Sequence, residues 1–188
     1  GYDENDHFIK EQVPNIKKRI PEEMLHIVEL PLRCNGNPCE AWNILYKIAL
    51  KNDEVEYFYQ CGSDIRHLNI RWDDYLIQLL KKNDNDAIVG GVEQNQWVNR
   101  TFQDQNGILE NVMTTRKHFD RFGWFFPPEV KTWYSDDMIT RIYLNLGKCL
   151  ICPNIQYINT NRVGGHNDKS RYIPPEKEQI AKTWKSIA

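Results

Sequence analysis

The chain has 188 residues, of which 40% are hydrophobic and 27% charged, and its formal net charge is -2. A chain of this length and balance folds as a globular domain without disulfide bonds, which excludes disordered and disulfide-dependent classes. The mildly acidic charge gives no indication of a nucleic-acid partner, and no apolar run approaches the roughly 20 residues of a membrane span. We expect a cytoplasmic domain, or one in the secretory lumen if a signal precedes Gly1.

Cysteine usage allows two interpretations. The five cysteines are an odd number in a chain too long to need a disulfide framework. Cys149 and Cys152 have the spacing of half a zinc site, yet they lie in an apolar run, and the other close pair, Cys34 and Cys39, is spaced more widely. We interpret the cysteines as buried, reduced thiols, with metal binding as the alternative.

Predicted strands and helices alternate along the chain. The acidic start, residues 1–6, reads as a loop. The patterns then predict, in order, a strand over 25–32, a helix over 40–50, a strand over 56–60, a helix over 72–81, a strand over 86–92, a long loop over 93–107, a strand over 110–115 with a short helix after it, a helix over 136–146 and a strand over 148–157. This order predicts an α/β fold with a mixed, mostly parallel sheet flanked by helices, in a single domain over 1–188 with a loop and short helix over 161–188.

Helical spacing also predicts which side chains face the interior. They are Ala41, Ile44, Leu45, Ile48 and Ala49 in the first helix, Tyr75, Leu76, Leu79 and Leu80 in the second, and Ile139, Ile142, Tyr143 and Leu146 in the last.

Asp64 lies just after a predicted strand, in the string YFYQCGSDI. In an open α/β sheet ligands bind beyond the carboxyl ends of the strands, so this carboxylate is placed to hold a divalent cation on a diphosphate. Gly62 and Ser63 let the backbone turn and approach a phosphate closely. The simpler alternative is that Asp64 only caps the turn.

Asp136 and Asp137 form an acidic pair at a predicted helix start, directly after Trp133 and Tyr134. The helix dipole favours acidic residues there, so capping accounts for one of them without any function. A partly desolvated carboxylate can act as a general base toward a sugar hydroxyl, and aromatic faces pack against sugar rings. On the local sequence alone, capping stays ahead of catalysis.

The order of these segments resembles glycosyltransferases of the GT-A fold, in particular the inverting group that includes chitin, cellulose and hyaluronan synthases. In that group a helix carrying an asparagine precedes a strand that ends in an Asp-rich metal motif, and a later acidic pair supplies the catalytic base. Asn43, Asp64 and the pair Asp136-Asp137 take those places here. The strings YFYQCGSDI, FFPPE and WYSDDMITRIY are similar to a branch of these domains found in large DNA viruses and some protists.

The resemblance implies transfer of a sugar from a nucleotide-sugar donor to a hydroxyl of a glycan, protein or lipid-linked acceptor, with Mn²⁺ or Mg²⁺ as the cofactor. Residue by residue, it implies Asp137 as the general base with Asp136 beside it, Asp64 and His166 at the metal, Asn43, Gly62, Ser63 and Arg171 at the donor diphosphate, and Trp133 and Tyr134 at the acceptor. Without the resemblance, a loop histidine such as His166 reads as a solvated surface residue.

Two departures from the family pattern define the alternatives. An Asp-x-Asp triplet ending at Asp64 would begin at Gly62, so one carboxylate of the metal motif is missing. The family fold also opens with a nucleotide-binding strand, which we expect upstream of Gly1. A non-catalytic pseudo-glycosyltransferase or carbohydrate-binding module is the main alternative. A metal-dependent nuclease using Asp64 and Asp136 is weaker, because the chain is mildly acidic.

Overall fold

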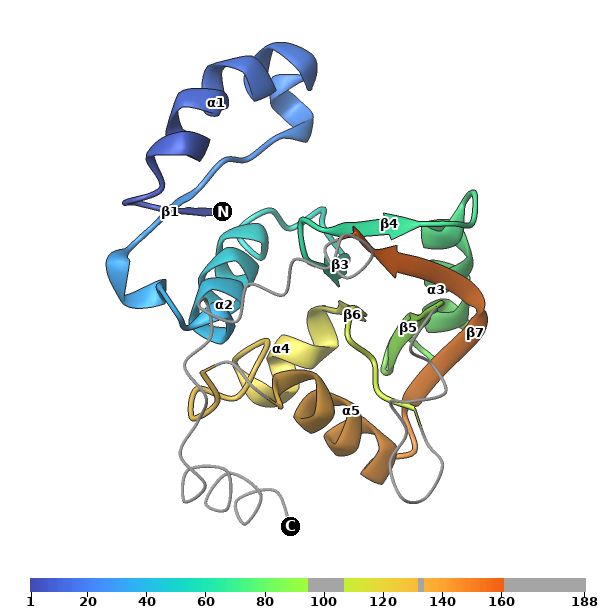
Figure 1. The fold of residues 1–188 in the computed structure, drawn as a ribbon. Coiled ribbons are helices and arrows are strands. Elements are labelled where there is room, and N and C mark those ends of the chain that lie inside the picture. The colour runs from blue at the N-terminus through green and yellow to red at the C-terminus, as the bar shows by residue number, and fades with distance from the viewer. Residues whose placement is uncertain (95–106, 132–133, 161–188) are drawn as a thin grey trace.

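The computed structural model describes residues 1–94, 107–131 and 134–160, and it is a mixed α/β structure (Figure 1). The helices are α1 (His7–Arg19), α2 (Pro38–Ala49), α3 (Trp72–Lys82), α4 (Arg116–Phe122) and α5 (Ser135–Asn145). The strands are β1 (Tyr2–Asp3), β2 (Glu29–Leu30), β3 (Tyr57–Gln60), β4 (Ile65–His67), β5 (Ile88–Glu93), β6 (Val112–Thr115) and β7 (Cys149–Asn159). The α/β class that the alternation predicts is confirmed.

Strands β3 to β7 form one five-stranded sheet within the described residues, in the order β3-β6-β5-β7-β4. Within this sheet, as far as the structure describes it, β5 and β7 pair in parallel and the other three pairings are antiparallel; β1 and β2 pair in parallel as a separate two-stranded sheet. The prediction of a mostly parallel sheet is therefore wrong, because β6 inserts antiparallel between β3 and β5. The sheet also curls, since its two edge strands bring the rings of Tyr59 and His67 to a centroid distance of 5.5 Å.

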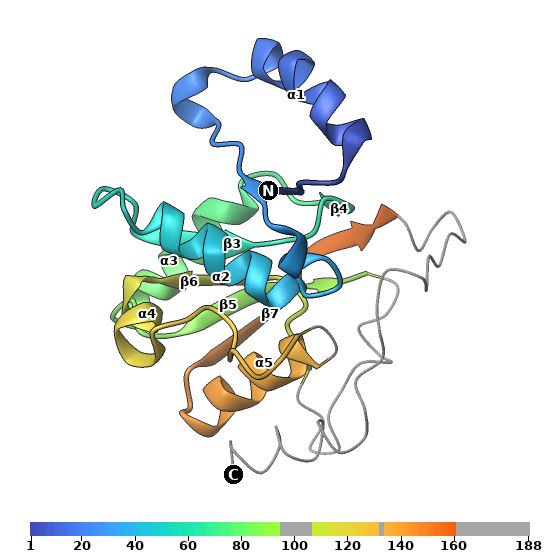
Figure 2. The same ribbon diagram turned by 90° about the vertical axis from the view of Figure 1, so that its left-hand side faces the viewer.

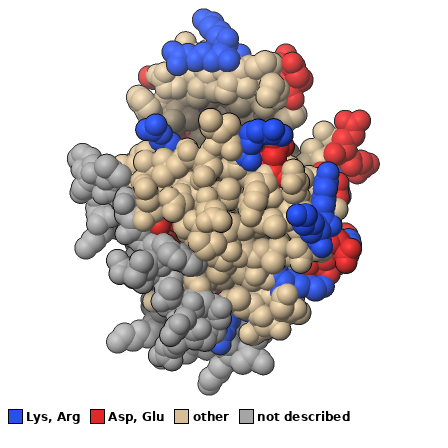
Figure 3. Space-filling model, turned by 90° about the vertical axis from the view of Figure 1, so that its right-hand side faces the viewer, with Lys and Arg blue, Asp and Glu red and all other residues tan. Residues whose placement is uncertain are grey.

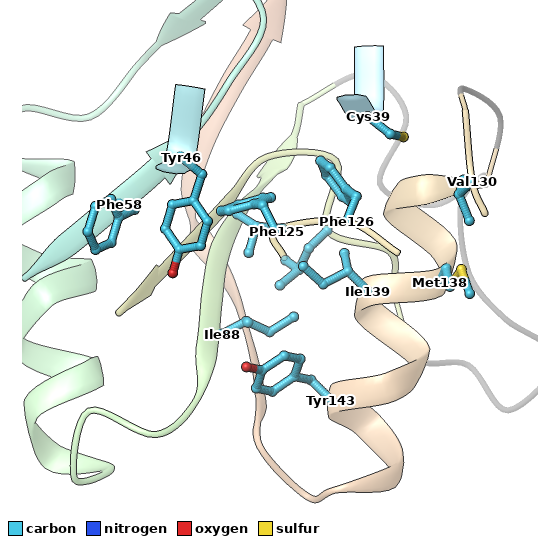
Figure 4. Packing of buried hydrophobic residues seen from close by; sticks show 12 residues of the cluster. Cys39, Tyr46, Phe58, Ile88, Phe125, Phe126, Val130, Met138, Ile139 and Tyr143 are labelled. Carbon is cyan, nitrogen blue, oxygen red and sulfur yellow. The ribbon is translucent and has the colours of Figure 1, made fainter. Parts of the chain in front are cut away.

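Helices cover both faces of this sheet. α3 lies on one face, and α2, α4 and α5 lie on the other (Figures 1 and 2). Successive strand side chains point to opposite faces, so Phe58 packs among the second group of helices while Tyr59 packs with α3. In the larger cluster the Tyr46 ring lies 4.7 Å from that of Phe58 and 5.0 Å from that of Phe125 (Figure 4). The sheet thus has a hydrophobic cluster on each side.

Several elements near the N-terminus differ from their predictions. Only Glu29–Leu30 of the strand expected over 25–32 forms a strand, because the neighbour it pairs with is itself two residues long. That neighbour is β1, inside the expected loop over 1–6. Helix α1 was not predicted, although Ile9, Val13 and Ile16 recur at helical spacing; none of its side chains is buried, and Pro14 lies inside it. In Figure 1 it stands away from the sheet.

The prediction that a side chain faces the interior is wrong at two positions. Tyr75 is 45% exposed and Leu146 46% exposed, whereas Leu76, Leu80 and Tyr143 are buried as predicted. α3 packs on the sheet through a narrow stripe, and Leu146 lies just beyond the last residue of α5. The prediction of buried side chains is therefore correct at the centre of the buried face of these two helices and wrong at its margin.

Arg116 at the start of α4 holds the connection between α2 and β3. Its Nε donates to the Val55 carbonyl oxygen over 2.7 Å and its Nη1 to that of Leu50 over 3.1 Å. Nη2 donates to the Asn52 carbonyl oxygen. These contacts fix the end of α2 next to the beginning of β3, and they therefore place the start of α2 near the opposite end of that strand.

Gly91 lies in β5 where the register with β7 shifts, between Gly90 and Val92. A Cβ atom at Gly91 would overlap the backbone carbonyl oxygen of Ile155 in β7. Because a central strand cannot move aside freely, we expect Gly91→Ala to lower the free energy of unfolding by about 2 kcal/mol, measured by urea denaturation. Gly147→Ala is the control, since no atom lies within 4 Å of its added methyl group.

The control separates the cost of backbone strain from the cost of steric overlap between the added methyl group and its neighbours. Gly147 has a φ of 66°, so alanine there introduces backbone strain alone, which should cost about 1 kcal/mol. Equal stability of wild type and Gly91→Ala would contradict the close approach of β5 to β7.

Candidate functional site

Strands β3, β5 and β7 end at one edge of the sheet. They run in the same direction because β6 is antiparallel to both β3 and β5, and β7 is parallel to β5. We call this edge the carboxyl edge. Helices α2, α3 and α5 each lead into one of these strands, so their N-termini lie at the same edge. The positive end of the helix dipole favours anionic ligands there.

Asp64 lies at the carboxyl edge, in the short loop between β3 and β4. Its backbone carbonyl oxygen accepts hydrogen bonds from the N–H (2.7 Å) and the Oγ1 (3.0 Å) of Thr160, the residue directly after β7. A Cβ atom at Gly62 would overlap Asp64 Oδ1, so the carboxylate lies against the α-carbon of Gly62. Glycine at this position therefore permits the observed placement of the Asp64 side chain. Ser63 between them is exposed.

The acidic pair lies in the first turn of α5. The Asp137 N–H donates to Asp136 Oδ1 over 3.1 Å, but this contact lies inside the helix, and no side chain caps its N-terminus. Both carboxylates lie where the helix dipole favours negative charge. Tyr134, which precedes the helix, has a φ of 70° and is 42% exposed. A left-handed backbone is unusual for a bulky residue, and such strain concentrates at functional sites. The structure thus places an exposed aromatic side chain next to the two carboxylates in sequence, at a helix N-terminus.

The first turn of α2 contacts the chain that leads to α5 and, through a hydrogen bond between the Cys39 side chain and Ser135, the start of α5 itself. The Cys39 N–H donates to the Lys131 carbonyl oxygen over 3.2 Å. Burial raises the pKa of the Cys39 thiol to about 12, and the charge of Asp136 acts in the same direction. Figure 4 shows Cys39 above the chain at Val130 and Met138, which belong to the same buried cluster. Two helix N-termini therefore meet at the carboxyl edge.

Asn43 lies one turn further along α2, and its amide contacts the backbone of the segment after α4. Its Oδ1 accepts from the N–H of Phe125 (2.7 Å) and of Phe126 (2.9 Å), and its Nδ2 donates to the Phe126 carbonyl oxygen (2.9 Å). Donor binding by Asn43 remains a prediction of the resemblance. What the geometry adds is a direct connection between α2 and the chain that leads to α5.

Sequence reasoning missed further polar groups at the same edge. Glu93, the last residue of β5, is 4% exposed, and Asn111 just before β6 is 3% exposed. The Tyr157 hydroxyl donates to Glu110 Oε2 over 3.3 Å. The rule that singled out Asp64, an acid directly after a strand, applies equally to Glu93 and would have found it.

The implied metal ion does not fit the described residues well. They contain no group of three or more His, Cys, Asp or Glu side chains arranged to hold an ion. Asp64 is the predicted ligand among them, and His166 lies outside the described residues, as do Arg171 and Trp133. Mn²⁺ or Mg²⁺ binding therefore stays a prediction, and no step below depends on it.

The half zinc site considered for Cys149 and Cys152 has no support in their placement. Cys149 packs against the cluster on the side of α2 and α5, whereas Cys152 belongs to the cluster under α3. The two thiols thus face opposite sides of the sheet and cannot share an ion. All five cysteines are free and none is exposed, which agrees with the interpretation as structural thiols.

The surface on the side of α3 and β7 shows no basic patch among its described residues. Lys and Arg side chains lie near its margins and are interspersed with Asp and Glu, while other residues cover its centre (Figure 3). This face gives no support to the nuclease alternative, which requires a surface that attracts a polyanion. Among the described helices, none is long and apolar enough to cross a bilayer.

Comparisons of the chain with protein-family models, with curated proteins and with solved structures find no match. The fold and the geometry of the carboxyl edge are therefore the basis for the functional proposal.

Proposed function

We propose that the chain is a glycosyltransferase domain of the GT-A kind that transfers a sugar from a nucleotide-diphosphate donor to a hydroxyl acceptor. The observation that carries the proposal is that Asp64 and the pair Asp136-Asp137, which are far apart in sequence, both lie at the carboxyl edge. This is the edge at which open α/β sheets bind ligands. The order of segments that resembles the family and their arrangement in space thus point to the same part of the molecule.

Asp137 is the proposed general base. Its carboxylate takes the proton of the acceptor hydroxyl while the hydroxyl oxygen forms a bond to the anomeric carbon of the sugar. The bond from that carbon to the diphosphate breaks, and the diphosphate leaves with the electron pair. Asp137 lies in the first turn of α5, where the helix dipole favours negative charge.

Other groups at the carboxyl edge have supporting roles in this proposal. The positive ends of the α2 and α5 helix dipoles favour the negative charge that develops on the departing diphosphate. Asp64 is assigned to the donor diphosphate, through an ion if one binds, and Tyr134 offers an exposed ring to the acceptor sugar. His166, Arg171 and Trp133 keep the roles that the resemblance implies.

A non-catalytic carbohydrate-binding relative is the second candidate. The observation in its favour is Gly62, which stands where the family carries a carboxylate, and whose α-carbon is covered by Asp64 Oδ1. A carboxylate at position 62 would need Asp64 to move, so the described loop has room for one acid only. Such a protein would retain the aromatic and polar groups of the carboxyl edge without binding a nucleotide diphosphate.

Calorimetric titration separates the two candidates. We expect saturable binding of at least one uridine or guanosine diphosphate sugar with a dissociation constant between about 1 μM and 1 mM. We expect Asp64→Asn to weaken that binding about tenfold or more, and the titrations are run with and without Mn²⁺. The control is Asp53→Asn, an exposed acid in the connection that Arg116 holds, away from the carboxyl edge.

Absence of heat with every donor, together with binding of an oligosaccharide, would favour the carbohydrate-binding alternative. Equal donor affinity in wild type and Asp64→Asn would show that Asp64 does not bind the donor. The proposed transferase activity would then depend on the effect of Asp137→Asn on the rate of transfer.

A further inference from the structure

Helix α2 contacts both ends of the segment 125–131, which leads toward the start of α5. The Asn43 amide makes three hydrogen bonds to the backbone of Phe125 and Phe126, and one helical turn earlier the Cys39 N–H donates to the Lys131 carbonyl oxygen. The Asn43 side chain and the backbone of the first turn of α2 thus bind the two ends of the segment. The acidic pair follows only a few residues after Lys131.

These hydrogen bonds use most of the donors and acceptors of the Asn43 side chain. Its carbonyl oxygen has two lone pairs, and both are occupied by backbone N–H groups. One of its two N–H groups is also occupied, by the Phe126 carbonyl oxygen. At most one weak donor remains for a ligand, which is a poor basis for recognising a diphosphate.

The partners of Asn43 depend on it. Phe125 and Phe126 are each 3% exposed, and their rings are part of the buried cluster against α2 and α5. Their N–H groups would be left buried without an acceptor if the Asn43 side chain were removed, which is costly away from water. The segment would then have to shift to reach another acceptor.

We propose that Asn43 is a positioning residue that fixes segment 125–131 and, through it, the place of Asp136 and Asp137 at the carboxyl edge. Its effect on catalysis rests on the proposed function, whereas its effect on the segment does not. It differs from the donor-binding role that the resemblance implies, because it acts on the base and not on the nucleotide sugar.

The test compares Asn43→Ala and Asn43→Asp with Arg116→Met. Arg116→Met is the matched control, since it also removes side-chain hydrogen bonds to three backbone carbonyl groups but does so at the other end of α2. Asn43→Asp keeps an acceptor for both N–H groups and loses only the donation to Phe126. The readouts are amide hydrogen exchange at Phe125 and Phe126, the NMR shift of the Asp137 N–H, donor affinity, and kcat.

For Asn43→Ala we expect amide exchange at Phe125 and Phe126 to rise about tenfold or more above the rise caused by lower global stability. We expect a shifted Asp137 resonance, a kcat lowered about tenfold or more, and a donor affinity within about twofold of wild type. Asn43→Asp should recover most of the protection and of the rate. Arg116→Met should lower stability and leave the local exchange and kcat close to wild type.

Unchanged exchange and an unshifted Asp137 resonance in Asn43→Ala would overturn the positioning role. A loss of donor affinity with unchanged exchange would instead show that Asn43 binds the donor. If wild type neither binds donors nor transfers sugar, the proposed function fails, and the exchange and NMR results still decide whether Asn43 holds the segment.

Discussion

Asp137→Asn is expected to lower the rate of sugar transfer by about 10²- to 10⁴-fold, while donor affinity stays within about twofold of wild type. The amide is nearly the same size as the carboxylate but cannot accept the proton of an acceptor hydroxyl. The hydrogen bond from the Asp137 N–H to Asp136 Oδ1 involves the backbone and survives the substitution. The rate is measured as nucleotide diphosphate released in the presence of acceptor, and the affinity by calorimetry.

Asp136→Asn is the matched comparison within the pair. Asp136→Asn keeps an oxygen that can accept the hydrogen bond from the Asp137 N–H and removes a negative charge near the positive end of the helix dipole, so it should affect the helix start more than the proton transfer. We expect a smaller loss of rate, about tenfold or less, with a modest loss of stability. An Asp137→Asn variant that retains most of the wild-type rate, or a larger loss in Asp136→Asn, would show that the base has been assigned to the wrong residue.

Periodicity predicted the elements that bury a stripe of side chains. Leu76 and Leu80 in α3 and Ile139 and Tyr143 in α5 recur at helical spacing and are all buried, so these helices could be read from the sequence. Tyr46 was not among the predicted inward positions of α2, although it is 5% exposed. Its hydroxyl donates to the Thr115 carbonyl oxygen over 3.1 Å, and a partner of this kind, distant in sequence, cannot be recognised from spacing.

Strand order and direction depend on pairing between distant segments, and the sequence of a single strand does not indicate its partner or its direction. The pairing of Val89 with Met113 places β6 next to β5, and nothing in the string VMTT distinguishes this from a parallel neighbour. The same limit applies to the site. Asp64 could be predicted because it follows a strand. The close approach of its carboxylate to the α-carbon of Gly62, however, arises from the conformation of the loop. The hydrogen bonds of Asn43 join residues more than 80 positions apart.

His118 is expected to make the folded state sensitive to acid. The side chain is 1% exposed, its Nδ1 lies 2.7 Å from the Tyr143 hydroxyl, and its Nε2 lies 3.0 Å from the Phe125 carbonyl oxygen. A neutral ring satisfies both contacts if Nε2 donates to the carbonyl group and Nδ1 accepts from the hydroxyl. Burial lowers the pKa of His118 to about 4, and the positive charge of Arg121 acts in the same direction.

The direction of the pH effect follows from this lowered pKa. Unfolded chains bind a proton at histidine below a pH of about 6.5, whereas the folded chain resists protonation of His118 until about pH 4. The contribution to stability is therefore complete above the unfolded pKa, falls as the pH is lowered through this window, and is lost at its lower end. The loss amounts to about 3 kcal/mol in the free energy of unfolding, from 1.36 kcal/mol per pKa unit.

Urea denaturation of wild type and His118→Gln at several pH values between about 7.5 and 4 measures this loss. Glutamine can still donate to the Phe125 carbonyl oxygen but does not titrate, so the gap in stability between the two proteins should narrow as the pH falls. A difference in the free energy of unfolding between the two proteins that does not change with pH would show that His118 is not held neutral. Protonation adds a proton to Nδ1, which can then no longer accept from the Tyr143 hydroxyl, and it places a buried charge next to the Phe125 carbonyl group, so acid should loosen the segment before α5 first. Amide exchange at Phe125 is therefore expected to rise at a higher pH than exchange in β5, and simultaneous exposure of both would place the acid sensitivity elsewhere in the fold.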